Sequence, residues 1–155
     1  AIALAFEDGV DYLLEKPRKL SEGLIDNQMR FLIVAIGIPT SLLLLIIYVV
    51  LLRLGFNPEL TRTFIFATFG TYSLFLVFAV RNLQKSIFSY NFFSNPYILF
   101  GTGLGFILMF SAIYLPALQN ILKTTALPPI WLLGVAGVGI INLTAIEFGK
   151  WMYRK

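Results

Sequence analysis

Residues 31–54 read FLIVAIGIPTSLLLLIIYVVLLRL, and this stretch decides the fold class. Its first 22 residues carry no charge, and its mildly polar interruptions are Thr40, Ser41 and Tyr48. A helix needs about 20 apolar residues to cross the hydrocarbon core of a bilayer. Such a helix can also be buried in a large soluble core, but a chain of 155 residues is too short to bury this run and three more like it. The stretch therefore predicts a membrane-spanning helix.

The remaining apolar runs predict three further spans. Proline, asparagine and charged residues separate the runs, and backbone groups inside a bilayer must be hydrogen-bonded within each helix. Because the connections are short, we expect successive helices to run antiparallel. The predicted fold is an all-α membrane protein, an antiparallel bundle of four transmembrane helices preceded by a cytoplasmic N-terminal segment. The predicted spans are residues 31–54, 63–80, 97–115 and 130–148.

Composition supports a membrane protein and excludes several classes of site. Hydrophobic residues make up 58% and aromatic residues 15% of the chain, and the mean hydropathy is +0.83. The net charge of +4 comes from basic residues scattered over loops and ends, which is not the continuous basic stripe of a nucleic-acid-binding protein. The chain has no cysteine and no histidine. A disulfide framework, a zinc site of those ligands, a cysteine nucleophile and a histidine base are therefore excluded.

The distribution of basic residues predicts the topology. Residues 1–30 hold six acidic and four basic side chains and form a first, aqueous domain; residues 31–155 form the bundle. Nine of the 12 Lys and Arg residues lie in the N-terminal segment, the bridge between spans two and three, and the C-terminal tail. By the positive-inside rule these three parts are cytoplasmic, so both termini are cytoplasmic. We expect a plasma membrane of prokaryotic type.

Two groups of polar residues in the spans are candidates for an ion path. Thr71 and Ser73, near Thr68 and Tyr72 in the second span, offer hydroxyl oxygens at mid-membrane depth. Hard cations prefer several oxygens with a carboxylate among them, and hydroxyls bonded to their own or a neighbouring helix are the competing explanation. Glu147 is the one acidic residue within a predicted span, and a structural pair with Lys150 at i,i+3 is the favoured interpretation.

Glycines predict where the helices approach closely. GTGLG at residues 101–105 superficially matches a phosphate-binding loop, but no strand precedes it and it lies in an apolar run, so helix packing is favoured. Gly134, Gly137 and Gly139 in the fourth span have the same interpretation.

The chain also resembles a known family along its whole length. AIALAFE at residues 1–7, followed by DYLLEKPR at residues 11–18, is similar to the segment of cation-transporting P-type ATPases that leaves their sixth transmembrane helix. RNLQKSIFSYNFFSNPYI is similar to the stretch between helices eight and nine, SAIYLPALQNIL to the end of helix nine, and AIEFGKWMYRK to the close of helix ten. Leu13 stands where the family pattern has methionine.

The resemblance implies that the four spans are helices seven to ten, a membrane-embedded support subdomain of a pump. Its partners would be the lipid bilayer and the remaining helices and cytoplasmic domains, with no nucleic acid. ATP and Mg²⁺ would be cofactors of the parent pump, since the D-K-T-G-T, T-G-E-S and G-D-G-x-N-D motifs do not occur in these 155 residues. The chain alone would be inactive. Ser73 lies at or beside a position where calcium-pumping members have glutamate, which argues against a second calcium site of that type and leaves the cation open.

A free-standing four-helix membrane protein with a regulatory or assembly role is the main alternative. A membrane-embedded enzyme is disfavoured because the spans lack convergent His, Asp or Glu residues. A further alternative is a small channel or carrier built as an oligomer, which predicts ion flux through vesicles that contain this chain alone.

Overall fold

The computed structural model describes residues 30–31, 33–80 and 94–154. The predicted N-terminal domain, except for Arg30, and the bridge at residues 81–93 lie outside these residues. Within them the structure is helical and contains no strand. The elements in chain order are η2 (Ile33–Gly37), α3 (Ile38–Arg53), α4 (Pro58–Val80), α5 (Pro96–Tyr114), α6 (Pro116–Leu122) and α7 (Pro129–Arg154).

The first span is interrupted near its start by a π-helical turn. Pro39 lies in the first turn of α3 and has no N–H to donate to the carbonyl of residue 35, and the adjoining turn takes the wider π form of η2. As a result α3 has 16 residues, too few to cross a bilayer alone, whereas η2 and α3 together run from residue 33 to residue 53.

The second helix begins earlier than the sequence predicts. Gly55 adopts a φ of +84° in the turn after α3. The side chain of Asn57 then accepts hydrogen bonds from the backbone N–H groups of Glu59, at 2.7 Å, and Leu60, at 3.4 Å. Because Pro58 is suited to a first helical position, α4 starts there, five residues before the predicted start at Thr63.

Proline also sets the bounds of α5 and α6. Asn95 caps α5 by accepting from the N–H groups of Tyr97 and Ile98, with Pro96 next to it. Pro116 follows the end of α5 and also opens α6, a short helix within the connection between the predicted third and fourth spans. Lys123 closes α6 in the left-handed conformation, with a φ of 56°.

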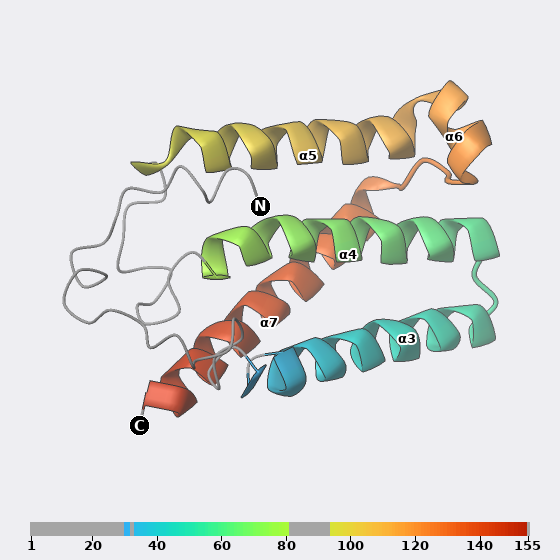
Figure 1. Ribbon diagram of the computed structural model, residues 1–155. Coiled ribbons are helices and arrows are strands. Elements are labelled where there is room, and N and C mark those ends of the chain that lie inside the picture. Colours follow the sequence, from blue (N-terminus) through green and yellow to red (C-terminus); the bar gives the residue numbers. More distant parts are fainter. Residues whose placement is uncertain (1–29, 32, 81–93, 155) are drawn as a thin grey trace.

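The four long helices form an antiparallel bundle with α4 at its centre, which confirms the predicted fold class. In Figure 1 they run alternately in opposite directions, and α7 crosses the others obliquely. Helix α4 packs against α3, α5 and α7. One buried cluster, around Phe64, Ala67, Met109, Ile113 and Val135, joins α4, α5 and α7 at the end where α3 turns into α4. A second cluster, which includes Phe78, Ile98 and Ile146, joins the same helices at the opposite end.

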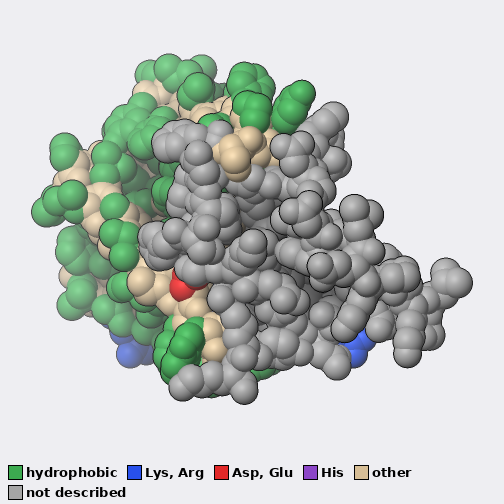
Figure 2. Space-filling model, turned by 90° about the vertical axis from the view of Figure 1, so that its left-hand side faces the viewer, with side chains coloured by type: hydrophobic (Ala, Val, Ile, Leu, Met, Phe, Trp, Pro, Cys, Tyr) green, Lys and Arg blue, Asp and Glu red, His purple; other side chains and the backbone are tan. Residues whose placement is uncertain are grey.

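The outer surface of the bundle is apolar. Helices α4, α5 and α7 are each long and apolar enough to cross a membrane. Phe100 is 75% exposed and Leu133 69% exposed, and hydrophobic side chains make up most of the described surface in Figure 2. So large an apolar surface is unfavourable in water, whereas contact with lipid chains carries no such free-energy penalty. The protein is therefore an integral membrane protein.

Candidate functional site

The hydroxyls of the polar patch on α4 are held mainly by the bundle itself. Thr68 is buried and donates to the Phe64 carbonyl of its own helix at 2.8 Å. Thr71 is buried and donates to the Met109 sulfur of α5 at 3.9 Å, a weak bond between two helices. These two contacts agree with the alternative to cation binding, in which the hydroxyls bond to their own or a neighbouring helix.

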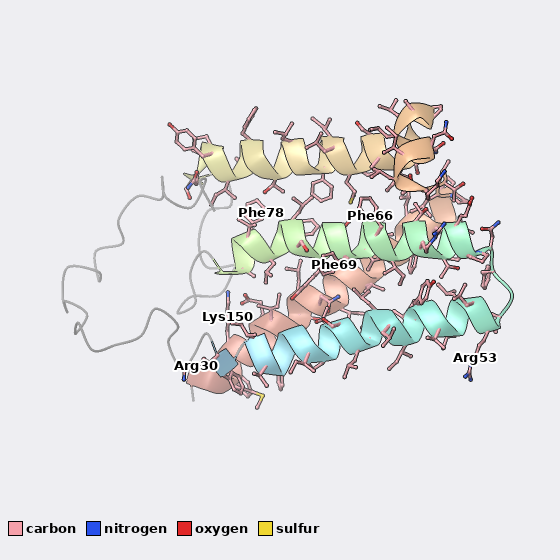
Figure 3. All side chains as sticks on the ribbon, turned by 45° about the vertical axis from the view of Figure 1, so that its right-hand side comes forward. Arg30, Arg53, Phe66, Phe69, Phe78 and Lys150 are labelled. Atoms are coloured by element: carbon pink, nitrogen blue, oxygen red, sulfur yellow. The ribbon has the colours of Figure 1, made fainter. Side chains whose placement is uncertain are left out.

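The structure does not bring the two ion-path candidates, Thr71 and Ser73, together. Residues two apart on an α-helix point about 200° away from each other. Thr71 accordingly faces the interior between α4, α5 and α7, whereas Ser73 is half-buried on the same side as the exposed Phe66 and Phe69. Figure 3 labels these two phenylalanines on α4. Thr71 and Ser73 therefore cannot bind one ion from within this helix, and each remains a separate prediction.

A buried polar contact that the sequence analysis did not predict joins α3 to α7. Thr40 Oγ1 donates to Asn142 Oδ1 at 2.8 Å, across 102 residues of sequence. Asn142 Nδ2 donates to the Val138 carbonyl at 3.1 Å, and the Tyr72 side chain of α4 lies beside Thr40. Asn142 is only 2% exposed. Thr40 and Asn142 could have been noticed in the sequence because each is a polar residue in an apolar run. The sequence does not show, however, that these two side chains contact each other.

An ion pair lies near the C-terminal end of α7. Lys150 Nζ lies 2.9 Å from Glu147 Oε1, and the exposed fractions of the two side chains are 0% and 16%. This confirms the predicted i,i+3 pair. Figure 3 shows Lys150 and Arg30 at one end of the bundle and Arg53 at the other. In this pair the Glu147 carboxylate and the Lys150 ammonium neutralise each other, whereas burying either charge alone would destabilise the fold.

Side chains replace the backbone hydrogen bonds that Pro116 removes at the end of α5. Pro116 has no N–H for the Ala112 carbonyl, and the Thr124 hydroxyl donates to that carbonyl at 2.5 Å. Gln119 Nε2 donates to the Ile113 carbonyl at 2.6 Å. The region after α6 is thereby tied to α5, and it is also tied to α4, because the Thr125 N–H donates to Thr63 Oγ1 at 2.9 Å.

The glycines pack closely at some of the predicted positions only. A Cβ added at Gly105 would collide with the Leu74 side chain of α4, and one at Gly134 would lie 3.1 Å from the Phe64 ring. Gly103 and Gly137 have open space around the same position. The expectation of close approach is confirmed at Gly105 and Gly134. No described residue approaches Gly103 or Gly137, where the expectation stays a prediction.

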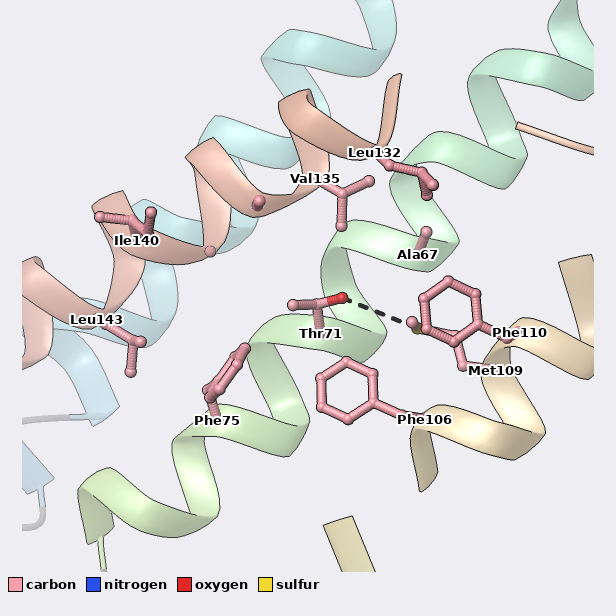
Figure 4. A pocket seen from close by; sticks show the side chains of 12 residues that line it. Ala67, Thr71, Phe75, Phe106, Met109, Phe110, Leu132, Val135, Ile140 and Leu143 are labelled. Carbon is pink, nitrogen blue, oxygen red and sulfur yellow. Dashed lines mark hydrogen bonds between the residues drawn. The ribbon is translucent and has the colours of Figure 1, made fainter. Parts of the chain in front are cut away.

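A cavity of about 380 Å³ lies between α4, α5 and α7. Figure 4 shows Thr71 of α4 pointing into it toward Met109 of α5. Its lining is almost wholly apolar and includes Ala67, Phe106, Met109, Val135 and Gly139.

No group of three or more His, Cys, Asp or Glu residues that could hold a metal ion occurs in residues 30–31, 33–80 and 94–154. The described part of the chain therefore supplies helix packing, interhelical hydrogen bonds of Thr40 and Thr71 and an apolar cavity, and does not by itself assemble a carboxylate-rich site of the kind that a hard cation prefers.

Comparison with known proteins identifies the family. The family model described as cation transporting ATPase, C-terminus, matches residues 1–152. A calcium-transporting ATPase of Bacillus subtilis (strain 168) is 33% identical over 153 residues, which cover 94% of this chain and 16% of that protein. Calcium-transporting ATPase 1 of Yarrowia lipolytica (strain CLIB 122 / E 150) is 32% identical over 83 residues, 54% of this chain and 9% of that protein. The chain thus spans at most about a sixth of the curated relatives it matches. It belongs to the cation-transporting ATPase C-terminal family, as the C-terminal membrane domain of a P-type ATPase.

Proposed function

We propose that this domain is the support block of an ATP-driven cation pump and is inactive alone. The observation that carries the proposal is the central position of α4, which packs against α3, α5 and α7 and is joined to them by two buried clusters. The Thr40–Asn142 hydrogen bond adds a link between α3 and α7. A block held together in this way suits a scaffold against which other helices move, because packed cores do not deform continuously.

One face of α4 remains available to the rest of the pump. By helical register Ser73 shares a face with Phe66 and Phe69, and this face points away from the interior that Thr71 lines. We propose that the remaining transmembrane helices of the pump lie along it. Ser73 would then be the candidate that faces the ion path, and Thr71 would have a packing role.

The transported cation is proposed from the relatives. Both are calcium-transporting ATPases by name, which makes Ca²⁺ the first cation to test. Neither Thr71 nor Ser73 brings a carboxylate, so the strong ligands would come from other helices. ATP and Mg²⁺ would bind to the cytoplasmic domains of the pump. In the proposed topology both termini are cytoplasmic, and the end of the bundle that carries Arg30 and Lys150 faces the cytoplasm of a prokaryotic-type cell.

Epitope tagging of the native gene after Lys155 tests whether the domain works as part of a larger pump. We expect a membrane band several times heavier than 17.5 kDa, because the aligned region makes up 16% of the Bacillus relative. A band at the mass of the chain itself would favour the free-standing regulatory or assembly protein.

Transport by the intact protein tests the activity. Inside-out vesicles that contain it should take up Ca²⁺ when ATP is added, whereas the 155-residue chain alone should form no phosphoenzyme. A Ser73→Ala variant should weaken the apparent Ca²⁺ affinity, and Thr144→Ala should not, because the exposed Thr144 hydroxyl bonds only to its own helix. Phosphorylation of the isolated chain would refute the proposal.

A further inference from the structure

The short helix α6 lies at the level where the spanning helices end. Its neighbour α5 has 19 residues, which at about 1.5 Å per residue reach about 29 Å, close to the roughly 30 Å of a bilayer's hydrocarbon core. Figures 1 and 3 both show α6 turned across the end of α5, at the same end of the bundle as the turn between α3 and α4. Because the long helices cross the bilayer, α6 lies close to the plane of the membrane surface.

The residues of α6 divide into an apolar and a polar side. The helix reads PALQNIL and is followed by Lys123. At about 100° per residue, its large apolar side chains fall within one arc of about 100°. They are Leu118, Ile121 and Leu122. The polar side chains fall within a second such arc on the other side of the helix. They are Gln119, Asn120 and Lys123. A helix with an apolar side and a lysine on its polar side is suited to the membrane–water interface.

The apolar side of α6 is exposed and continues the lipid-facing surface of the bundle. Ile121 is 74% exposed and Leu122 is 51% exposed. Leu115, which joins α5 to α6, is 52% exposed, and Leu108 on the spanning helix itself is 60% exposed. Apolar side chains therefore remain exposed from the membrane-spanning part of α5 into α6. An exposed apolar surface that adjoins the bilayer indicates contact with lipid.

Hydrogen bonds fix the position of α6 relative to α5. Within α6, Gln119 Nε2 donates to the Ile113 carbonyl of α5 at 2.6 Å. Directly after α6, the Thr124 hydroxyl donates to the Ala112 carbonyl of α5 at 2.5 Å. Both bonds would break if α6 turned its apolar side toward the bundle. The side that carries Ile121 is therefore held facing outward.

We propose that α6 is an anchor in the membrane–water interface, with the surface of one leaflet as its partner. The side that carries Ile121 and Leu122 inserts among the upper parts of the acyl chains, and Asn120 and Lys123 stay among the headgroups, where the ammonium pairs with phosphate. Because α6 is bonded to α5 and connects it to α7, this contact sets the depth of both helices in the leaflet. The inference requires only that the long helices span a bilayer and does not depend on transport.

Site-directed spin labelling tests the proposal. The 155 residues contain no cysteine, so single cysteines are introduced at Asn120, Ile121, Leu122 or Leu133 of the complete protein, after any cysteines elsewhere in it are replaced. Nitroxide labels on these cysteines are studied in phosphatidylcholine vesicles. Their collision rates are measured with oxygen, which concentrates in the bilayer, and with the neutral complex nickel ethylenediaminediacetate, which stays in water. Leu133 of α7 is 69% exposed and serves as the reference for lipid contact.

An anchored α6 predicts that the ratio of oxygen to nickel collisions at Ile121 and Leu122 lies at least about threefold above the ratio at Asn120, toward the value at Leu133. A ratio at Ile121 no higher than at Asn120 would place α6 in water. Low collision rates with both reagents at Ile121 would show that another part of the protein covers it. Either result would overturn the proposal.

A matched pair of variants gives a second test, with the label kept at Leu122. Ile121→Glu introduces a charge on the apolar side of α6 and should lower the collision ratio at Leu122 at least about threefold. Asn120→Glu introduces the same charge on the polar side and should leave the ratio within about 1.5-fold. Thermal unfolding of both variants checks that they are folded. An unchanged ratio in a folded Ile121→Glu protein would contradict the proposal.

Discussion

Replacement of Thr40 by valine should measurably loosen the contact between α3 and α7. The change removes the hydroxyl that donates to Asn142 Oδ1 at 2.8 Å and keeps the volume and branching of the side chain. Interhelical hydrogen bonds in membranes contribute about 0.6 kcal/mol on average and up to about 1.7. The Asn142 oxygen is left in a site only 2% exposed, and an unpaired buried acceptor costs about 1–3 kcal/mol. We therefore expect a loss of about 1–2 kcal/mol.

The assay is SDS-induced unfolding of the chain in bicelles, followed by tryptophan fluorescence with Trp151 replaced by phenylalanine, so that the signal comes from Trp131. This ring reports on the bundle because its edge-on contacts with Phe56 and Phe64 have centroid distances of 5.3 and 5.2 Å. Thr144→Val is the control, since the Thr144 hydroxyl is exposed and donates to its own helix at 2.8 Å; it should cost less than about 0.5 kcal/mol.

A double-mutant cycle completes the test of this contact. Thr40→Val combined with Asn142→Leu removes both partners and should show a coupling energy of at least about 0.5 kcal/mol. The reasoning is refuted if the two changes are additive, or if Thr40→Val costs no more than the control.

Three further predictions use the same unfolding measurement. Gly105→Ala should destabilise by about 1–3 kcal/mol because its Cβ collides with the facing helix, whereas Gly103→Ala, into open space, should be neutral or stabilising; equal effects would contradict the packing. Thr124→Val should lower the free energy of unfolding by about 1–2 kcal/mol, because the Ala112 carbonyl loses its hydrogen-bond donor, and Thr124→Ser should retain most of the stability. An unchanged stability of Thr124→Val would show that this hydrogen bond is unimportant. Glu147→Gln should destabilise by weakening the partner of the fully buried Lys150, and unchanged stability would show that other contacts hold that ammonium.

The predicted spans agree with the helices to within a few residues except where capping decides the ends. Apolar runs identify which residues can lie in lipid, but a helix can begin in the polar residues before the run. Asn57 and Pro58 start α4 five residues before Thr63, and α7 continues six residues past Phe148 to Arg154. The short helix α6 was missed because PALQNIL is polar enough to be read as a loop. The π turn of η2 was missed because Pro39 lies inside an otherwise continuous apolar run.

The candidate site was predicted less completely than the fold. Thr71, Ser73 and the Glu147–Lys150 pair were identified because they are polar residues in apolar helices, and local spacing was sufficient for the ion pair. The Thr40–Asn142 bond was not identified, because it depends on which faces of two distant helices meet. Apolar periodicity gives little information about helix rotation in a membrane protein, where lipid-facing and buried side chains are equally apolar.

The amino-acid sequence alone determines that this chain lies in a membrane as a bundle of long apolar helices, and its motifs place it among the cation-transporting ATPases. The reason is that hydrocarbon accepts only long apolar helices whose backbone is satisfied internally, a requirement that can be read from the sequence. Only the tertiary structure decides that α4 is the central helix, that Thr71 rather than Ser73 faces the interior, and that a partly open cavity lies between three helices. These features depend on the rotation and crossing of each helix, which the packing of small and large side chains selects among rods of similar composition.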